Sequence, residues 1–204
     1  LKSALDQNVQ LLANHSATQL IDENGKISGA IFKTPEGLVQ IRAKHGVVLA
    51  TGGFPHDDER KLKLFQHVAD GTPHFSAAPE TNTGDGLKLA ESVGAEVDAN
   101  LSCNAAWAPV SLIPRLDGTL GRFPHLVERG KPGLIAVLPN GKRFTNEGDS
   151  YPAFIKDLFK NTQKGDLARC WLICDHKFIR RYGLGAVKPF PISMQPWIDN
   201  GYLK

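Results

Sequence analysis

One segment of this chain concentrates side chains that could do chemistry: Arg143-Phe144-Thr145-Asn146-Glu147-Gly148-Asp149-Ser150-Tyr151. An arginine and a carboxylate can order a loop as an ion pair, and a phenol can transfer a proton. The apolar run 133–138 before it predicts a buried strand, and Pro139-Asn140-Gly141-Lys142 predicts a tight turn. Residues 152–161 after it carry apolar side chains at helical spacing. The segment therefore connects a strand to a helix, where folds commonly present functional groups.

The same residues are also typical of an ordinary turn that leads into a capped helix. Ser150 or Asp149 would be the N-cap, and Pro152 would occupy one of the first helical positions. Capped turns are common, so the local chemistry by itself favours this structural interpretation. The remainder of the chain has to decide between the two.

The composition is typical of a globular protein, with 41% hydrophobic and 22% charged residues, and 204 residues suffice for one large or two small domains. A formal net charge of +3 without a basic stripe argues against a nucleic-acid partner. No apolar run is long enough to indicate a membrane span. The three cysteines are an odd, widely spaced set, which favours a reducing, cytoplasmic location over a disulfide framework and predicts no metal site.

Two glycine-containing turns stand beside apolar segments: the first follows a predicted strand, and the second precedes a predicted helix. Residues 46–50 predict a buried strand that ends at Thr51-Gly52-Gly53, and paired glycines allow a backbone to approach a ligand closely. A strand followed by a flexible turn fits these letters equally well. Thr83-Gly84-Asp85-Gly86 leads into a helix predicted for Leu87–Val93, with Gly94 just after its end. The amides that open this helix could face an anion, or Asp85 is only its cap.

The beginning of the chain is rich in strand signals. Short extended runs are predicted at Val9–Ala13 and Ala17–Ile21. Lys26–Lys33 and Leu38–Ala43 each follow a turn sequence, so an antiparallel meander is expected.

Beyond residue 55 the pattern becomes more helical and less regular. Acidic residues at Asp57-Asp58-Glu59 predict a helix start. The stretch Asn100–Lys131, which includes Trp107, has little periodicity, and such a long irregular stretch usually lines or covers a site. A strand within Ala168–Asp175 and a helix at Lys177–Tyr182 are expected after the central segment.

Three motifs in order resemble the flavoprotein family of soluble fumarate reductases, succinate dehydrogenase flavoprotein subunits and 3-ketosteroid dehydrogenases. They are Val48-Leu49-Ala50-Thr51-Gly52-Gly53-Phe54, then Asn82-Thr83-Gly84-Asp85-Gly86 with Gly94-Ala95, then Gly141-Lys142-Arg143-Phe144-Thr145-Asn146-Glu147. The resemblance implies FAD as cofactor and an α+β architecture. Residues 1–54 would form a partial FAD-binding domain, made of antiparallel strands and the last strand of the FAD-domain sheet. A mixed α/β cap domain, which binds the substrate, would occupy residues 55–204.

The resemblance also implies that part of the flavoprotein lies outside this chain. No G-x-G-x-x-G follows a strand, although a dinucleotide held on such a turn requires it. The chain begins with Leu1 instead of an initiator methionine. We therefore expect a fragment centred on the cap domain, possibly truncated, that depends on missing FAD-domain segments of a parent chain. Alone it would bind FAD weakly or not at all, and it would be inactive.

The residues that the family uses to hold FAD and substrate can be placed one by one. By resemblance, the flavin lies near a set from the two glycine turns: Ala50, Thr51, Gly52, Gly53, Gly84 and Asp85. Fumarate reductases use an arginine as proton donor four residues after the motif glutamate, and this position is Tyr151 here. Their T-E-x-x-R-G carboxylate clamp retains Arg129 and Gly130, but Leu126 replaces the glutamate. These departures resemble the ketosteroid dehydrogenase branch.

The resemblance therefore implies an enzyme that dehydrogenates a carbon–carbon bond next to a carbonyl, with FAD accepting hydride. Tyr151 would transfer the proton, as an acid or as a base beside a cation, and Arg143 and Glu147 would order its loop. Trp107, Leu126 and Arg129 would meet a small-molecule, ketosteroid-like substrate. Two alternatives remain: reduction of an unsaturated carboxylic acid, as in fumarate reductases, and a covering module without activity of its own.

Overall fold

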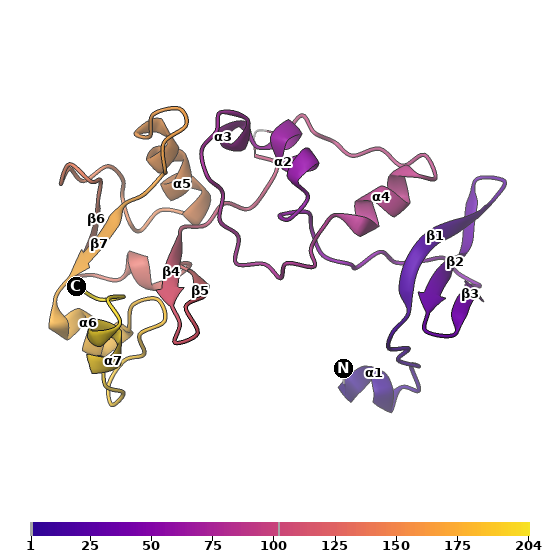
Figure 1. Ribbon diagram of the computed structural model, residues 1–204, viewed down its shortest axis with the longest axis horizontal. Coiled ribbons are helices and arrows are strands. Elements are labelled where there is room, and N and C mark those ends of the chain that lie inside the picture. The colour runs from indigo at the N-terminus through magenta and orange to yellow at the C-terminus, as the bar shows by residue number, and fades with distance from the viewer. Residues whose placement is uncertain (1, 102) are drawn as a thin grey trace. The chain divides into compact units, whose positions relative to one another are not determined.

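The computed structural model describes residues 2–101 and 103–204 and divides the chain into two compact units (Figure 1). The first unit is Leu1–Phe54 with Asn82–Asp98, and the second is Pro55–Thr81 with Ala99–Lys204. The chain thus leaves the first unit after Phe54 and returns to it for the segment that contains the second glycine turn. Separate clusters of buried apolar side chains give each unit its own core.

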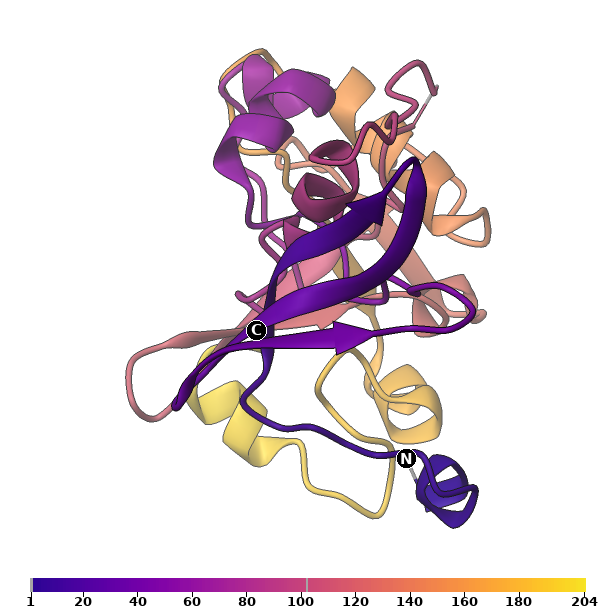
Figure 2. The ribbon, with the colours of Figure 1, turned by 90° about the vertical axis from the view of Figure 1, so that its right-hand side faces the viewer.

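The first unit is built on a three-stranded antiparallel sheet in the order β1-β2-β3 (Figure 2). Its elements are α1 (Lys2–Asp6), β1 (Ser16–Glu23), β2 (Lys26–Thr34), β3 (Gly37–Arg42) and α4 (Asp85–Glu91). Asn24 and Gly25 both have positive φ, +57° and +82°, which suits the tight turn between β1 and β2. Leu89 of α4 contacts Leu20 and Ala30 of the sheet. The predicted meander is confirmed.

Two strands predicted for this unit are wrong. Residues 9–13 and 46–50 have no strand conformation, and the Val48 side chain is 90% exposed. None of the described strands pairs with either segment. An apolar run forms a strand only where a neighbour completes its hydrogen bonds, and here none does.

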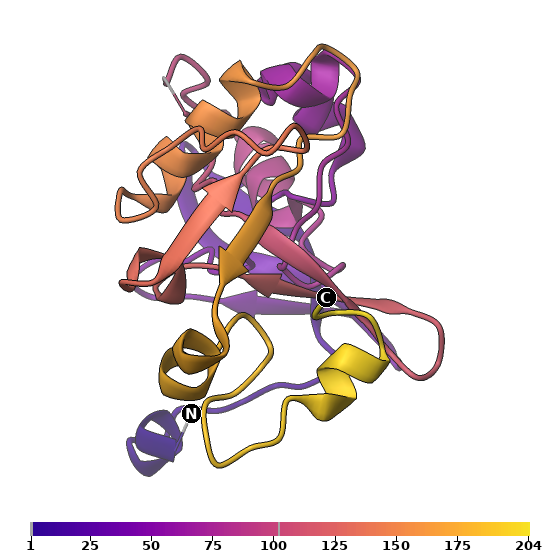
Figure 3. The same cartoon turned by 90° about the vertical axis from the view of Figure 1, so that its left-hand side faces the viewer.

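The second unit combines two antiparallel two-stranded sheets with short helices (Figure 3). Its strands are β4 (Val110–Pro114), β5 (Leu120–Pro124), β6 (Leu134–Val137) and β7 (Trp171–Cys174), paired as β4-β5 and β6-β7. Its helices are α2 (Asp58–Leu64), α3 (Gln66–Ala69), the 3-10 turn η1 (Glu128–Gly130), α5 (Tyr151–Lys160), α6 (His176–Tyr182) and α7 (Gln195–Asp199). Mixed helices and antiparallel sheets in both units make the chain α+β, as predicted.

The predicted irregular stretch 100–131 contains a regular hairpin instead. Strands β4 and β5 pair from Val110 opposite Pro124 to Pro114 opposite Leu120. Asp117 accepts hydrogen bonds from the amide and hydroxyl of Thr119 and closes the turn. A proline in a segment usually argues against a strand there, but prolines are tolerated at strand ends and on edge strands. Both strands of a two-stranded ribbon are edges, so the sequence pattern was misleading here.

The elements around the central segment match the prediction. Ala136 of β6 and Phe154 of α5 are both 0% exposed and belong to one apolar cluster with Leu158. Asp57 caps α2 through the Arg60 amide, and Ser150 caps α5 through the Ala153 amide. Helix α5 therefore begins at Tyr151, with its buried face against the β6 strand. No helix among the described residues has the length and apolarity needed to cross a bilayer.

Replacing Leu134 by alanine should lower the free energy of unfolding by about 2–5 kcal/mol, because the side chain is 6% exposed inside the β6–α6 core. Urea denaturation measures this change. Leu116→Ala is the matched control, since Leu116 is fully exposed in the β4–β5 turn, and its effect should stay within about 0.5 kcal/mol. Equal losses in the two variants would contradict the assigned core.

Candidate active site

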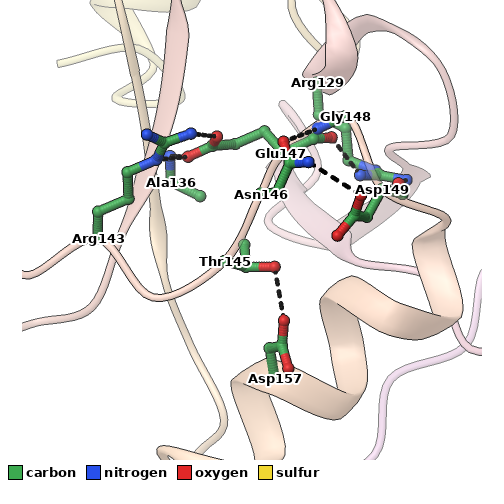
Figure 4. A network of polar contacts seen from close by, with 9 residues as sticks. All are labelled: Arg129, Ala136, Arg143, Thr145, Asn146, Glu147, Gly148, Asp149 and Asp157. Carbon is green, nitrogen blue, oxygen red and sulfur yellow. Dashed lines mark hydrogen bonds and ion pairs between the residues drawn. The ribbon is translucent and has the colours of Figure 1, made fainter.

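The Arg143 guanidinium and the Glu147 carboxylate form a two-pronged ion pair (Figure 4). Arg143 donates from Nε to Oε1 at 3.0 Å and from Nη2 to Oε2 at 2.5 Å. The backbone amide of Ala136 on β6 also donates to Glu147 Oε1, at 2.7 Å. Three donors thus converge on one carboxylate whose side chain is only 5% exposed, while that of Arg143 is 57% exposed. The ion pair fastens the loop after the turn to the strand before it.

Electrostatics keeps Glu147 ionised. Burial by itself works to raise the pKa of this carboxyl, but the hydrogen bonds from Arg143 and from the Ala136 amide outweigh it, so the pKa lies below its ordinary value. The same pairing raises the pKa of Arg143. A buried charge with this many donors acts as a structural anchor. Both carboxylate oxygens of Glu147 already accept hydrogen bonds within the protein.

Arg129 is a second anchor, and it binds backbone instead of a carboxylate. Its side chain is buried, with 3% of the residue exposed. It donates to the carbonyls of His125 at 3.2 Å, Glu147 at 2.5 Å and Asp149 at 2.7 Å. Its guanidinium also lies 5.3 Å from the centre of the Phe154 ring. Sequence reasoning expected Arg129 to meet substrate; in this geometry it holds the carbonyls on both sides of Gly148.

Tyr151 stands directly after this anchored loop, as the first residue of α5. Within the loop, Asn146 donates to Asp149 at 2.9 Å, and Thr145 donates to Asp157 of α5 at 2.9 Å (Figure 4). The Tyr151 side chain is half-buried. The backbone before a tyrosine that could transfer a proton is therefore held by hydrogen bonds to three different elements, β6, η1 and α5.

In the first unit the two glycine turns lie against each other. The Gly84 amide donates to the Gly53 carbonyl at 3.2 Å. A Cβ added to Gly52, whose φ is +84°, would lie 2.7 Å from the Asn82 side chain. A Cβ on Gly86 would collide with the Thr51 hydroxyl. The close approach requires glycine at both positions, and it leaves residues 51–53 exposed with little side chain above their backbone.

The remaining predicted substrate residues, Leu126 and Trp107, also belong to the second unit. Leu126 is 45% exposed just before η1. Trp107 belongs to an aromatic cluster with Phe65, at a centroid distance of 4.7 Å, and with His67, at 5.0 Å. The fold thus brings Arg129, Arg143 and Glu147 together around the loop that ends at Tyr151. Trp107 packs instead against the aromatic rings of Phe65 and His67. Sequence reasoning did not single out His67, because a lone histidine in an irregular stretch carries no motif.

Comparison with known proteins assigns the chain to a family. Residues 1–189 match the family described as FAD binding domain, which is most of the chain. The match extends across both units. The family description names an FAD-binding domain, whereas we expected a fragment centred on a cap domain. The assignment of residues 55–204 to a cap domain stays a prediction.

Several relatives are dehydrogenases of ring ketones by name. The 4-oxocyclohex-2-ene-1-carboxylate 5-dehydrogenase of Sinomonas cyclohexanicum is 35% identical over 100% of this chain and 34% of its own length. The 3-oxosteroid 1-dehydrogenase of Mycobacterium tuberculosis is 31% identical over 93% of this chain and 34% of its own. A crystal structure of 3-ketosteroid delta1-dehydrogenase from Sterolibacterium denitrificans superposes with a TM-score of 0.71 at 29% identity, over 96% of this chain and 35% of that one. The chain spans about a third of the length of these proteins.

Replacing Glu147 by glutamine should lower the free energy of unfolding by about 1–3 kcal/mol at neutral pH, because charge-assisted hydrogen bonds are lost. The pKa of Glu147 is lower in the folded protein than in the unfolded chain, so this stabilisation is complete above the ordinary value of 4.5 and disappears as the pH falls below it. Urea denaturation at about pH 7 and about pH 3 should therefore show a smaller difference at the acidic pH.

Glu80→Gln is the matched control, since Glu80 is an exposed carboxylate of the same unit. It should change the stability by less than about 0.5 kcal/mol at either pH. A Glu147→Gln variant as stable as this control at neutral pH would contradict the anchoring role of the buried carboxylate.

Proposed function

Because the chain belongs to the FAD-binding flavoprotein family, we propose that it is part of an FAD-dependent dehydrogenase that introduces a double bond beside the carbonyl of a cyclic ketone. The observation that carries the proposal is the position of Tyr151, at the end of a loop that Arg129 and the Arg143–Glu147 pair hold in place. A proton-transfer group needs such a fixed position, because misplacement by about 1 Å costs about 100-fold in rate.

The two glycine turns of the first unit fit the cofactor. Residues 51–53 present backbone with little side chain above it, and a Cβ at Gly52 or Gly86 would clash with the opposite turn and prevent their close approach. We assign the flavin-facing role to Ala50, Thr51, Gly52 and Gly53, with Gly84 and Asp85 from the opposite turn. When bound, FAD supplies the oxidant that accepts hydride, and the protein provides binding and orientation.

The reaction needs a proton removed from the carbon next to the ketone, and Tyr151 is the group we assign to this step. Both nearby arginines are committed to other bonds: Arg143 binds Glu147, and Arg129 binds three backbone carbonyls. Their role in the proposal is therefore to position Tyr151, and neither holds the substrate carbonyl directly. Glu147 takes part in the same way, through the loop.

An apolar ring substrate suits the surface before η1. Leu126 and Val127 are 45% and 69% exposed, which offers apolar contact and no charge. The relatives' names combine oxosteroids and oxocyclohexene carboxylates, which share a cyclic ketone. In the proposed enzyme, residues 1–54 belong to an FAD-binding domain and residues 55–204 to a cap domain, except that Asn82–Asp98 return to the first unit. The chain acts together with the remaining segments of a longer flavoprotein, in the cytoplasm.

Reduction of a fumarate-like dicarboxylate fits the geometry less well. A small dianion requires several free cationic donors. Arg129, which a carboxylate clamp would use, is buried and already donates to three carbonyls. Leu126 and Tyr151 replace the other charged groups of the fumarate reductase pattern. The ketone dehydrogenase is therefore the better-supported function.

In the full flavoprotein, Tyr151→Phe should slow anaerobic flavin reduction by a cyclic ketone by about 10²–10⁴-fold, because the proton-transfer group is removed. The loss of flavin absorbance after mixing with a 3-ketosteroid, or with a 4-oxocyclohexanecarboxylate, measures the rate. The variant should retain FAD. Tyr182→Phe is the matched control, since it removes a phenol from α6 of the same unit and should leave the rate unchanged.

Equal rates for Tyr151→Phe and wild type would remove Tyr151 from the mechanism. If neither ketone reduces the flavin, while an unsaturated carboxylic acid reoxidises the reduced enzyme, the fumarate-like reaction replaces the proposal. A preparation of the full protein without flavin would support a covering module without chemistry.

A further inference from the structure

Helix α6 presents three cations on the side turned away from the core. Phe178 and Ile179 of this helix are buried against strand β6. The exposed residues Lys177, Arg180 and Arg181 stand at positions i, i+3 and i+4. Residues three and four positions apart lie on the same side of a helix, so these three cations share the solvent-facing side of α6.

The net charge of the whole chain is concentrated at this end. Residues 1–174 carry equal numbers of basic and acidic side chains, whereas residues 175–204 carry five lysines and arginines against two aspartates. One of the two, Asp175, serves as the N-cap of α6. Among the described residues, no carboxylate forms an ion pair with the three cations of α6. Their charge is therefore directed to the solvent.

The loop after α6 places apolar side chains beside these cations. The Phe190 amide donates to the Arg180 carbonyl at 2.9 Å, and the Arg180 guanidinium lies 4.3 Å from the centre of the Phe190 ring. Phe190 is nevertheless 62% exposed, and Ile192 is 55% exposed. Lys188 is an exposed cation of the same loop. The loop between α6 and α7 projects from one end of the second unit (Figure 1, Figure 3).

We infer that α6 and the loop 188–192 form a surface that binds the protein to an anionic lipid bilayer. Phe190 and Ile192 enter the boundary between headgroups and acyl chains, and the cations beside them bind the anionic headgroups. A bilayer of this kind offers negative charge and an apolar layer next to each other, which is the combination that this surface presents.

The exposed apolar side chains favour a bilayer over other anionic partners. Nucleic acid would use the cations and the Phe190 ring, but it offers no apolar layer to Ile192. A projecting loop also suits insertion better than contact with a flat protein surface. The surface shares no residue with the Arg143–Tyr151 loop, so it goes beyond the proposed reaction. For the proposed dehydrogenase, and only on that premise, binding would bring the enzyme to where apolar ring ketones collect.

Co-sedimentation of the full flavoprotein with vesicles tests this inference. We expect binding to vesicles of equal parts phosphatidylglycerol and phosphatidylcholine, and at least about 10-fold weaker binding to phosphatidylcholine alone. Added salt should weaken the binding, because it screens the headgroup charge. Replacing Lys177, Arg180 and Arg181 together by glutamine should weaken it by about 100-fold, since each cation near an anionic surface contributes about fivefold.

The matched control replaces three exposed lysines of other elements in the same unit by glutamine, and it should bind within about twofold of wild type. These lysines are Lys63, Lys131 and Lys156. The control changes the net charge by the same amount as the α6 variant, so it separates the position of the charge from its total.

Two single variants test the apolar part. Phe190→Ser should weaken binding to the anionic vesicles by about 10-fold, because one inserted ring is lost. Leu116→Ser is its control, since Leu116 is a fully exposed apolar residue of the β4–β5 turn, and it should bind as wild type does. Circular dichroism checks the folding of each variant. Tyr151→Phe should also bind vesicles as wild type does, even where it stops flavin reduction.

Four results would overturn the inference. The first is no binding to the anionic vesicles, and the second is an equal loss in the α6 variant and in its lysine control. The third is vesicle binding that Tyr151→Phe abolishes. The fourth is a Phe190→Ser variant that binds as wild type does, which would assign the cations to nucleic acid or an acidic protein instead.

Discussion

The buried carboxylate of Glu147 is the group on which the arrangement of the second unit's active loop depends. A carboxylate removed from water is costly unless several donors meet it, and here Arg143 supplies two and the Ala136 amide supplies the third. The charge is tolerable only when strand, turn and loop are all in place. The ion pair therefore links strand β6, which is part of the core, to a loop that has no regular structure of its own.

Arg129 extends this constraint to the start of helix α5. Loop carbonyls that face the protein interior need donors, and one guanidinium serves those of Glu147 and Asp149 together with that of His125. The Ser150 cap then begins the helix directly at Tyr151. Arg129, which the resemblance placed against the substrate, thus joins Arg143 in holding the loop. The proposed proton-transfer chemistry needs one phenol, and the surrounding charges hold its backbone in place.

Local signals in the sequence were sufficient for much of this. The strand at 133–138, the turn after it and the α5 helix with a cap at Ser150 or Asp149 were all predicted, as were the meander of the first unit and a helix start at 57–59. Each depends on residues within a few positions of one another, through side-chain period, cap hydrogen bonds or turn chemistry. The motif order that resembles flavoproteins was also readable without a structure, and the family match agrees with it.

Only the tertiary structure decided which partners distant residues meet. Residues 46–50 have the composition of a strand but no neighbour to pair with, whereas the proline-bounded β4 and β5 do pair. The carbonyls that Arg129 binds at Glu147 and Asp149 lie 18 and 20 positions along the chain. One pocket of the second unit is lined by both His67 and Arg169, although about a hundred residues separate them in the sequence. The sequence by itself determined periodic elements, caps and motifs because those interactions are local. The folded chain was needed to show which strands pair, which groups surround a buried charge and which residues line a pocket. These residues are distant in the sequence, and only packing of the whole chain brings them together.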